Sequence, residues 1–206
     1  MNNQKIFIVD DDSSARKGIT RLLEAANLPC EAFKSAKDFL NSESYKEAGC
    51  LILDVSMPEM TGPELQDELQ KFDYVMPIIF LSAHGDVPLT ATVMKKGAVD
   101  FLTKPVDKND LIEAIERALK SDAENRSRFF KKESIQNKIK MLTQREYMVM
   151  TFVITGMLNK QIAAQMKISE ETVKIHRGRV MKKLEIASVA ELVNLCNIMG
   201  ISQAEH

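Results

Sequence analysis

Residues 50–54, Cys-Leu-Ile-Leu-Asp, decide the fold of the first half of the chain. Four apolar residues in a row are typical of a strand buried on both faces of a parallel sheet, and an aspartate follows them directly. A carboxylate in such a place is costly to desolvate unless a cation or hydrogen-bond donors accompany it. Asp54 is therefore a candidate functional residue.

The alternation of short apolar runs and helical segments extends on both sides of Asp54. The runs that predict strands are residues 5–9, 30–33, 50–53, 78–81 and 99–102. Helical apolar spacing occurs at residues 14–26, 36–43, 61–71, 87–96 and from 107 onward. These units predict an α/β fold, a five-stranded doubly wound parallel sheet of the flavodoxin type with strand order 2-1-3-4-5.

Polar side chains follow several of these predicted strands. Asp10 and Asp11 come after the first strand, Ser82 after the fourth and Lys104 after the fifth. Taken alone, the acids could simply favour the start of a helix, and Lys104 could be a solvated surface charge. Because the carboxyl ends of parallel strands line one crevice, we expect all of them to converge on Asp54.

Such a cluster predicts a magnesium site beside a reactive aspartate, because Mg²⁺ prefers oxygen ligands and keeps several waters. The predicted ligands are Asp10, Asp11, Asp54 and the backbone carbonyl of Ser56. The metal offsets the repulsion between Asp54 and an incoming phosphoryl anion, so that the carboxylate becomes a usable nucleophile. Lys104 and the Ser82 hydroxyl would hold the phosphoryl oxygens.

Charge divides the chain of 206 residues into two parts. Residues 1–120 carry 14 Lys and Arg against 20 Asp and Glu, whereas residues 121–206 carry 14 against 9. With 45% hydrophobic residues the chain can form two small domains with separate cores. A basic second half indicates an anionic partner, and nucleic acid is the first candidate.

The three cysteines, Cys30, Cys50 and Cys196, occur singly in apolar surroundings without metal-ligand spacing. We expect them to be small buried hydrophobic residues, with no disulfide. No apolar stretch approaches the roughly 20 residues of a membrane span, and the amino terminus passes straight into a predicted strand. These features predict a cytoplasmic protein without membrane association.

The predicted domains are residues 1–120 and 138–206, with a linker at residues 121–137. The linker lacks proline and glycine and is highly charged. Because it follows a helical apolar stripe, we expect a helix that continues to about residue 132, although a flexible linker also suits this composition.

Four short helices are predicted after residue 142, which makes the second domain small and all-α. Thr143 with Glu146, and Ser188 with Glu191, have the spacing of capping boxes ahead of the first and fourth helices. The second helix is residues 160–166, and Ser169 begins the third. The second and third form a helix-turn-helix.

The third helix is basic on one side, with five Lys and Arg against two Glu in residues 170–184. A basic face is often only solvated, but on the helix after a tight turn it is typical of a recognition helix in the DNA major groove. The predicted DNA contacts are Lys160, Thr172, Lys174, Ile175, Arg177, Gly178, Arg179, Lys182 and Lys183. Among them Lys174 and Ile175 reach base edges, while the arginines and the other lysines neutralise phosphates.

Four strings in the first half together resemble the receiver domain of two-component response regulators: IVDDD (8–12), LILDVSMPEMTG (51–62), IIFLSAHGDVP (78–88) and GAVDFLTKP (97–105). The resemblance implies that Asp54 accepts a phosphoryl group from a sensor histidine kinase. It also implies that Ser82, where many receivers have threonine, is the switch hydroxyl. Phe101 would be the aromatic residue that changes rotamer; without the resemblance it is simply a core aromatic on a strand.

Residues 140–199 resemble the LuxR-type helix-turn-helix, most specifically in LNKQIA (158–163) and TVKIHR (172–177). The combination with a receiver is similar to the FixJ/NarL class of transcription factors. Gly178 departs from some relatives, which have a basic base-reading residue at this position. Either the glycine permits close approach to the groove, or its neighbours read the bases.

The resemblance implies a transcriptional regulator whose phosphorylation promotes homodimerisation and binding to a two-fold site on double-stranded DNA. RNA polymerase is a further candidate partner. The apolar stripe of the fourth helix, Leu192, Leu195, Cys196 and Met199, is expected either to join two output domains or to close the core of its own domain.

Two other classes of protein compete with this interpretation. A phosphohydrolase also uses an aspartate nucleophile with Mg²⁺, but it needs a second acid, usually two residues on, where this chain has Ser56. A signalling adaptor that binds only proteins would have no use for the basic helix. We therefore expect a regulator that is not an enzyme.

Overall fold

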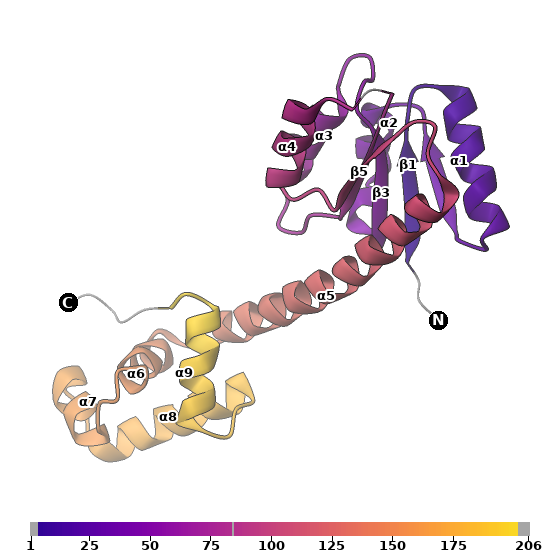
Figure 1. Cartoon of the computed structure of the whole chain (residues 1–206). Coiled ribbons are helices and arrows are strands. Elements are labelled where there is room, and N and C mark those ends of the chain that lie inside the picture. The colour runs from indigo at the N-terminus through magenta and orange to yellow at the C-terminus, as the bar shows by residue number, and fades with distance from the viewer. Residues whose placement is uncertain (1–3, 84, 202–206) are drawn as a thin grey trace. The chain divides into compact units, whose positions relative to one another are not determined.

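The computed structural model describes residues 4–83 and 85–201 and separates into two compact units (Figure 1). Unit 1 is Met1–Ser127 and unit 2 is Arg128–His206, so the division lies inside the predicted linker. In the described ranges, no helix has both the length and the apolar character that crossing a bilayer requires.

Unit 1 contains a five-stranded parallel sheet in the predicted order, β2-β1-β3-β4-β5. Its strands are β1 (Lys5–Val9), β2 (Cys30–Phe33), β3 (Gly49–Asp54), β4 (Ile78–Ser82) and β5 (Asp100–Thr103). Every residue of the central strand β3 is buried, because helices cover both faces of the sheet. This explains why its apolar run is continuous and why Asp54 stands at its carboxyl end.

Helices cover the two faces of the sheet (Figure 1). They are α1 (Ser13–Ala25), α2 (Ala36–Ser42), the short 3₁₀ helix η1 (Ser44–Lys46), α3 (Gly62–Leu69), α4 (Val87–Lys95) and the first part of α5 (Lys108–Lys140). The apolar residues of α1 and α5 pack on the face that carries Ile6 and Ile8. Those of α2, α3 and α4 pack on the face that carries Phe7 and Val9.

Local sequence signals explain where these helices begin and end. At α3 the Thr61 backbone N–H donates to Glu64 Oε2 at 2.8 Å, and Glu64 N–H donates to Thr61 Oγ1 at 3.4 Å, so a capping box begins this helix. Helix α4 ends ahead of Gly97, whose φ of 94° lies in the left-handed region that glycine tolerates.

Helix α5 continues to Lys140, not to about residue 132 as predicted. Its end was underestimated because Ile135 and Ile139 pack on the core of unit 2 and Lys138 pairs with Glu185 at 2.6 Å. On the unit 1 side, the buried Asp122 accepts hydrogen bonds from the Gly49 backbone N–H at 3.1 Å and from the Tyr74 hydroxyl. Helix α5 is thus held by contacts with unit 1 at Asp122 and by contacts with unit 2 at Ile135, Lys138 and Ile139.

Unit 2 contains the end of α5 and four further helices, α6 (Gln144–Ile154), α7 (Asn159–Met166), α8 (Glu170–Leu184) and α9 (Val189–Ile198). Each of the predicted capping residues Thr143, Ser169 and Ser188 accepts a backbone hydrogen bond at the start of its helix. Helix α8 packs against α6 and α7, and α9 packs against α6. The unit thus has the predicted helix-turn-helix in α7 and α8.

The apolar stripe of α9 closes the core of its own unit. Leu192, Leu195 and Cys196 are buried there, and Met199 packs against the same cluster. Leu192, Leu195 and Cys196 are therefore not available as a contact surface between output domains, whereas Met199 is only half-buried. Of the other two cysteines, Cys50 is buried but Cys30 is only half-buried at the edge strand β2, and all three are free thiols.

Candidate functional site

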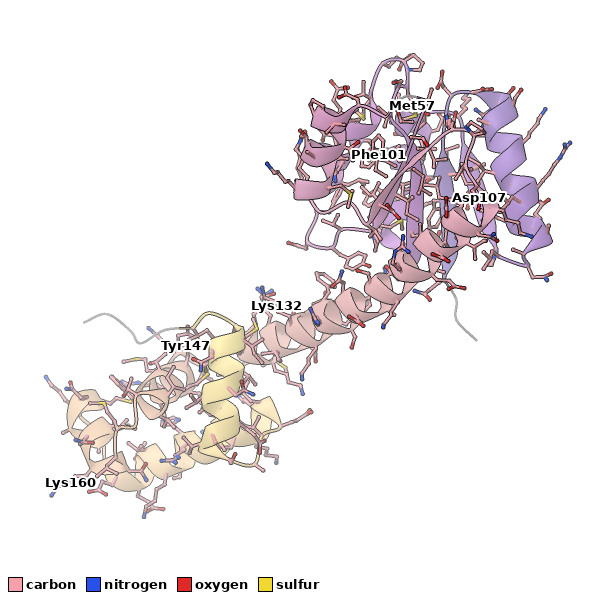
Figure 2. The ribbon with its side chains drawn as sticks, viewed as in Figure 1. Met57, Phe101, Asp107, Lys132, Tyr147 and Lys160 are labelled. Atoms are coloured by element: carbon pink, nitrogen blue, oxygen red, sulfur yellow. The ribbon has the colours of Figure 1, made fainter. Side chains whose placement is uncertain are left out.

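Polar side chains from four strand ends meet in one cleft of about 350 Å³ at the carboxyl edge of the sheet. Figure 2 marks this edge of unit 1 by Met57, in the loop after β3. The residues that line the cleft are Asp10, Asp11, Asp12, Asp54, Val55, Ser56, Ser82, Ala83, Asp86, Leu89 and Lys104. The structure therefore brings together the predicted acids, hydroxyl and amine, as the topology of a parallel sheet requires.

Lys104 bridges the two most buried carboxylates of the cleft. Its Nζ donates to Asp10 Oδ2 at 2.7 Å and also to Asp54 Oδ1. The second oxygen of each carboxylate accepts a backbone N–H: Ser56 donates to Asp54 Oδ2 at 2.7 Å, and Asp12 donates to Asp10 Oδ1 at 2.9 Å. Asp54 is thereby held with its carboxylate in the cleft and a backbone donor behind it.

The charge of Asp54 is poorly compensated. Burial raises the pKa of its carboxyl, and Asp10 raises it further, while the hydrogen bond and the charge of Lys104 lower it without reversing the shift. Burial alone would lower the pKa of Lys104, but its hydrogen bonds to Asp10 and Asp54 outweigh this and raise it. Lys104 therefore stays an ammonium, and an additional cation in the cleft would stabilise the charge of Asp54.

Backbone contacts shape the loop that presents Asp54. The Gly62 N–H donates to the Val55 carbonyl at 3.0 Å, which closes the loop onto the end of β3. A Cβ on Gly62 would lie 2.3 Å from the Asp54 carbonyl oxygen, so only glycine fits there. On the other side the Lys104 N–H donates to the Ser82 carbonyl at 2.7 Å, directly before the cis Lys104–Pro105 peptide bond.

Of the two predicted switch residues, Ser82 lines the cleft and Phe101 does not. Ser82 is buried at the end of β4 and lines the cleft. Phe101 is half-buried on the edge strand β5, paired in register with Phe80, and the centroids of their rings are 6.5 Å apart (Figure 2). Phe101 does not line the cleft, so any effect of the site on it has to pass through the ends of β4 and β5.

Sequence reasoning missed two residues of the cleft wall, Asp86 and Leu89. Both belong to the start of α4, where Asp86 Oδ1 accepts the Leu89 N–H at 3.4 Å. An aspartate before Val87-Pro88 is a helix-start signal that could have placed them there. Their presence means that α4 begins at the wall of the cleft.

The residues of the cleft fit a hard divalent cation. Five aspartates and one lysine line it, so carboxylates outnumber ammonium groups. Oxygen donors of this kind suit Mg²⁺. Within residues 4–83 and 85–201, no three acidic, histidine or cysteine side chains already surround a common point as a metal site does, and the Lys104 ammonium lies between Asp10 and Asp54.

Helix α8 presents the second set of predicted residues. Val173, Val180 and Leu184 are buried in the core of unit 2. The residues on the opposite side are exposed to solvent: Glu171, Lys174, Ile175, Gly178, Arg179 and Lys182. Lys160 is exposed on the neighbouring helix α7 (Figure 2).

Four predicted DNA contacts have partners within the protein, and one of them is Lys174, whose Nζ lies 3.4 Å from Glu171 Oε2. Lys183 donates to Glu146 Oε2 at 2.6 Å and to the Met141 carbonyl at 3.1 Å. Lys183 thus compensates a buried carboxylate of α6, and its contact with a DNA phosphate stays a prediction. Arg177 donates to Asn159 Oδ1 at 3.1 Å and is half-buried, and Thr172 N–H donates to Ser169 Oγ at 3.1 Å.

Comparisons with known proteins cover both units. Residues 6–116 match the family described as "Response regulator receiver domain", and residues 140–196 match "Bacterial regulatory proteins, luxR family". The chain is 42% identical to the response regulator protein TodT of Pseudomonas putida over 190 residues, which is 92% of this chain and 84% of TodT.

Solved structures of similar chains exist. The response regulator StyR is 42% identical with a TM-score of 0.81, over 94% of this chain and 98% of StyR. Full-length FixJ from B. japonicum is 34% identical with a TM-score of 0.58, over 98% of this chain and 99% of FixJ.

Proposed function

The chain belongs to the two-component response regulators of the FixJ/NarL class, with a receiver domain and a LuxR-type DNA-binding domain, and from this premise we propose that Asp54 is its phosphoacceptor. The family makes the chain a transcriptional regulator controlled by phosphorylation. The observation that carries the assignment of Asp54 is its place in the cleft, buried, hydrogen-bonded to Lys104 and surrounded by other aspartates.

In the proposed reaction a carboxylate oxygen of Asp54 attacks the phosphorus of a phosphohistidine on a sensor kinase. The new P–O bond forms as the P–N bond breaks, and the electron pair returns to the histidine nitrogen. Receiver domains as a family use Mg²⁺, which offsets the negative charge of the phosphoryl group; here Asp10, Asp11, Asp54 and the Ser56 carbonyl would hold it. Lys104, released from Asp54, pairs with a phosphoryl oxygen.

The switch is proposed to start at Ser82. Its side chain lines the cleft at the end of β4, and the hydroxyl can turn to donate to a phosphoryl oxygen on Asp54. Because β4 is paired with β5, this movement makes room for Phe101 to turn inward beside Phe80. We infer that the altered face around residues 87–117 then favours a homodimer.

The output is proposed to be sequence-specific binding of α8 in the major groove of DNA. The exposed side of α8 carries basic residues and is not used in the core of unit 2. A homodimer places two such helices on a two-fold site. RNA polymerase is the further partner that transcriptional control brings to the same DNA.

One feature supports a regulator that does not turn over an external substrate. The residue two positions after Asp54 is Ser56, whereas an aspartate-based phosphohydrolase has a second acid there. We also propose that the chain acts in the cytoplasm, where it can reach the DNA that its second domain implies.

The assignment of Asp54 is tested by incubating the full chain with Mg²⁺ and acetyl phosphate and measuring the mass of the intact protein. We expect one phosphoryl group on the wild type and none on Asp54→Asn, because an amide is a poor nucleophile. Asp73→Asn, which changes an exposed aspartate outside the cleft, is the matched control and should be labelled like the wild type. Full labelling of Asp54→Asn would refute the assignment.

The role of Ser82 is tested by sedimentation with and without acetyl phosphate. Ser82→Ala should still accept the phosphoryl group, since Asp54 is intact, but should show no phosphorylation-driven increase in mass. Ser82→Thr keeps the hydroxyl and should retain the increase. A complete shift to dimer in Ser82→Ala would show that the switch uses another group.

A further inference from the structure

Gly178 occupies the middle of α8, in the helix that faces DNA under the proposed function. A glycine inside a helix lowers helix stability relative to alanine, because it has more backbone freedom to lose. The glycine is exposed, and its neighbours on the same side are Lys174, Ile175 and Lys182. The glycine is therefore required either by a contact or backbone conformation within the protein or by a binding partner.

Neither of the usual internal reasons applies to Gly178. Its φ is not in the left-handed region, unlike that of Gly97, which is 94°. Nothing lies within 4 Å of a Cβ built on it, whereas a Cβ on Gly62 would collide with the Asp54 carbonyl. The protein itself would accept a side chain at position 178. What the glycine provides is an uncovered stretch of helix backbone toward solvent.

Ile175 lies one turn before Gly178 on the same exposed side. It is 47% exposed, although it is a large apolar residue in a basic helix whose buried side already has Val173, Val180 and Leu184. We call the exposed side chain of Ile175 and the open space over Gly178 the notch; the exposed charged residues around it are Glu171, Lys174, Arg179 and Lys182. This combination suits an apolar group attached to an anionic partner.

We propose that the notch of Ile175 and Gly178 accepts the C5-methyl group of a thymine in the major groove. The groove is about 12 Å wide and a helix with its side chains is about 10–12 Å across, so a position without a side chain lets the backbone come closer to the bases. The notch has no side-chain donor or acceptor, and the thymine methyl is the apolar group that the standard bases display in this groove.

This inference rests on the proposed function, since it requires α8 to enter the groove. The test uses the full chain treated with acetyl phosphate and a duplex that the wild type selects from a randomised library. Each thymine of that duplex is then replaced in turn by uracil, which lacks only the methyl group. For the wild type we expect one position per half-site at which uracil weakens binding about fourfold, the effect of one buried methyl group.

Two variants connect that thymine to the notch. Ile175→Ala removes the apolar wall, so its binding should no longer distinguish thymine from uracil at that position. Gly178→Ala fills the notch, so it should bind the thymine duplex about tenfold more weakly and recover affinity when the thymine is replaced by uracil. Lys182→Ala should weaken both duplexes equally, since a phosphate contact does not sense the methyl group.

Gly18→Ala is the matched control, because Gly18 is also exposed in the middle of a helix, α1, with nothing within 4 Å of an added Cβ. It should leave DNA binding unchanged. Thermal unfolding should show Gly178→Ala to be at least as stable as the wild type, so that weaker binding is not a folding defect. The inference fails if Gly178→Ala keeps the wild-type preference for thymine. If the wild type shows no sequence preference at all, the proposed function fails instead.

Discussion

Each unit of the molecule buries a carboxylate against a lysine, and the two pairs differ in how completely they are compensated. In unit 1, Lys104 is shared between Asp10 and Asp54 in a cleft with three further aspartates. In unit 2, Glu146 is the one carboxylate paired with Lys183, and Glu146 also accepts the Thr143 backbone N–H at 2.9 Å. In the first cluster one ammonium is shared by two carboxylates, and in the second it pairs with one.

The pKa values of the two carboxyls reflect this difference. The pKa of Asp54 is raised, chiefly by burial, whereas the hydrogen bond from Lys183 lowers the pKa of Glu146 to about 2. A buried carboxylate with a cation of its own and a lowered pKa stabilises the fold. A buried carboxylate that shares its cation and lies beside an open cleft is suited to an incoming cation and reaction partner.

Substitution of each lysine tests whether the two ion pairs have different roles. Lys183→Met leaves the Glu146 charge buried without its cation, so we expect the free energy of unfolding of unit 2 to fall by about 3 kcal/mol. Lys104→Met should destabilise unit 1 less, because Asp54 and its neighbours open onto a cleft. Millimolar Mg²⁺ should restore unit 1 in Lys104→Met and have no effect on unit 2 in Lys183→Met.

Urea unfolding of the full chain measures both changes, with the methyl NMR signals of Met57 reporting on unit 1 and those of Met150 on unit 2. Both methionines are buried in the cores of their units. Equal losses in the two variants, both insensitive to Mg²⁺, would mean that the two pairs have the same structural role.

The site in unit 1 could be predicted from the sequence because its residues follow strands. Once the apolar runs predict a parallel sheet, the ends of β1, β3, β4 and β5 have to meet at one edge, whatever the details of packing. The convergence of Asp10, Asp54, Ser82 and Lys104 therefore needed no knowledge of side-chain contacts. Asp86 and Leu89 were missed because they enter the cleft from the first turn of a helix.

The pairing of Lys183 with Glu146 could not be predicted in the same way. The two residues are 37 positions apart, and they meet only because α6 packs against α8. In the sequence, Lys183 is indistinguishable from its neighbour Lys182, which is exposed. The end of α5 was also beyond prediction, since a charged helix without glycine or proline carries no local stop signal and ends where unit 2 provides apolar contacts.

Two exposed lysines of α8 are predicted to have different roles in DNA binding. Lys174 and Lys182 are exposed, and the contact of Lys174 with Glu171, at 3.4 Å, is a surface pair. Lys174→Ala should lose about 1 to 3 kcal/mol of discrimination between a selected and a random duplex, because it removes a base contact. Lys182→Ala should weaken both alike and flatten the salt dependence by about one unit.

Salt titrations of the two variants on both duplexes separate these outcomes. If Lys174→Ala and Lys182→Ala lose specific and non-specific binding equally, Lys174 is a phosphate contact. The reading of bases would then belong to Ile175, Arg177 or Arg179. Of these, Arg177 would first have to leave Asn159.

The last expected effect is a pH dependence of the stability of unit 2. The pKa of Glu146 is about 2 in the folded chain and 4.5 in its ordinary environment, so the folded state binds the proton more weakly than the unfolded state. The stabilisation is therefore fully present above pH 4.5 and is lost as the pH falls toward 2. In urea unfolding followed through Met150, unit 2 of Glu146→Gln should have a lower free energy of unfolding than the wild type above pH 4.5. As the pH falls from 4.5 toward 2, that free energy should decrease less in the variant than in the wild type. The same slope in both proteins would assign the acid sensitivity of unit 2 to other carboxylates and remove Glu146 as the structural counterpart of Asp54.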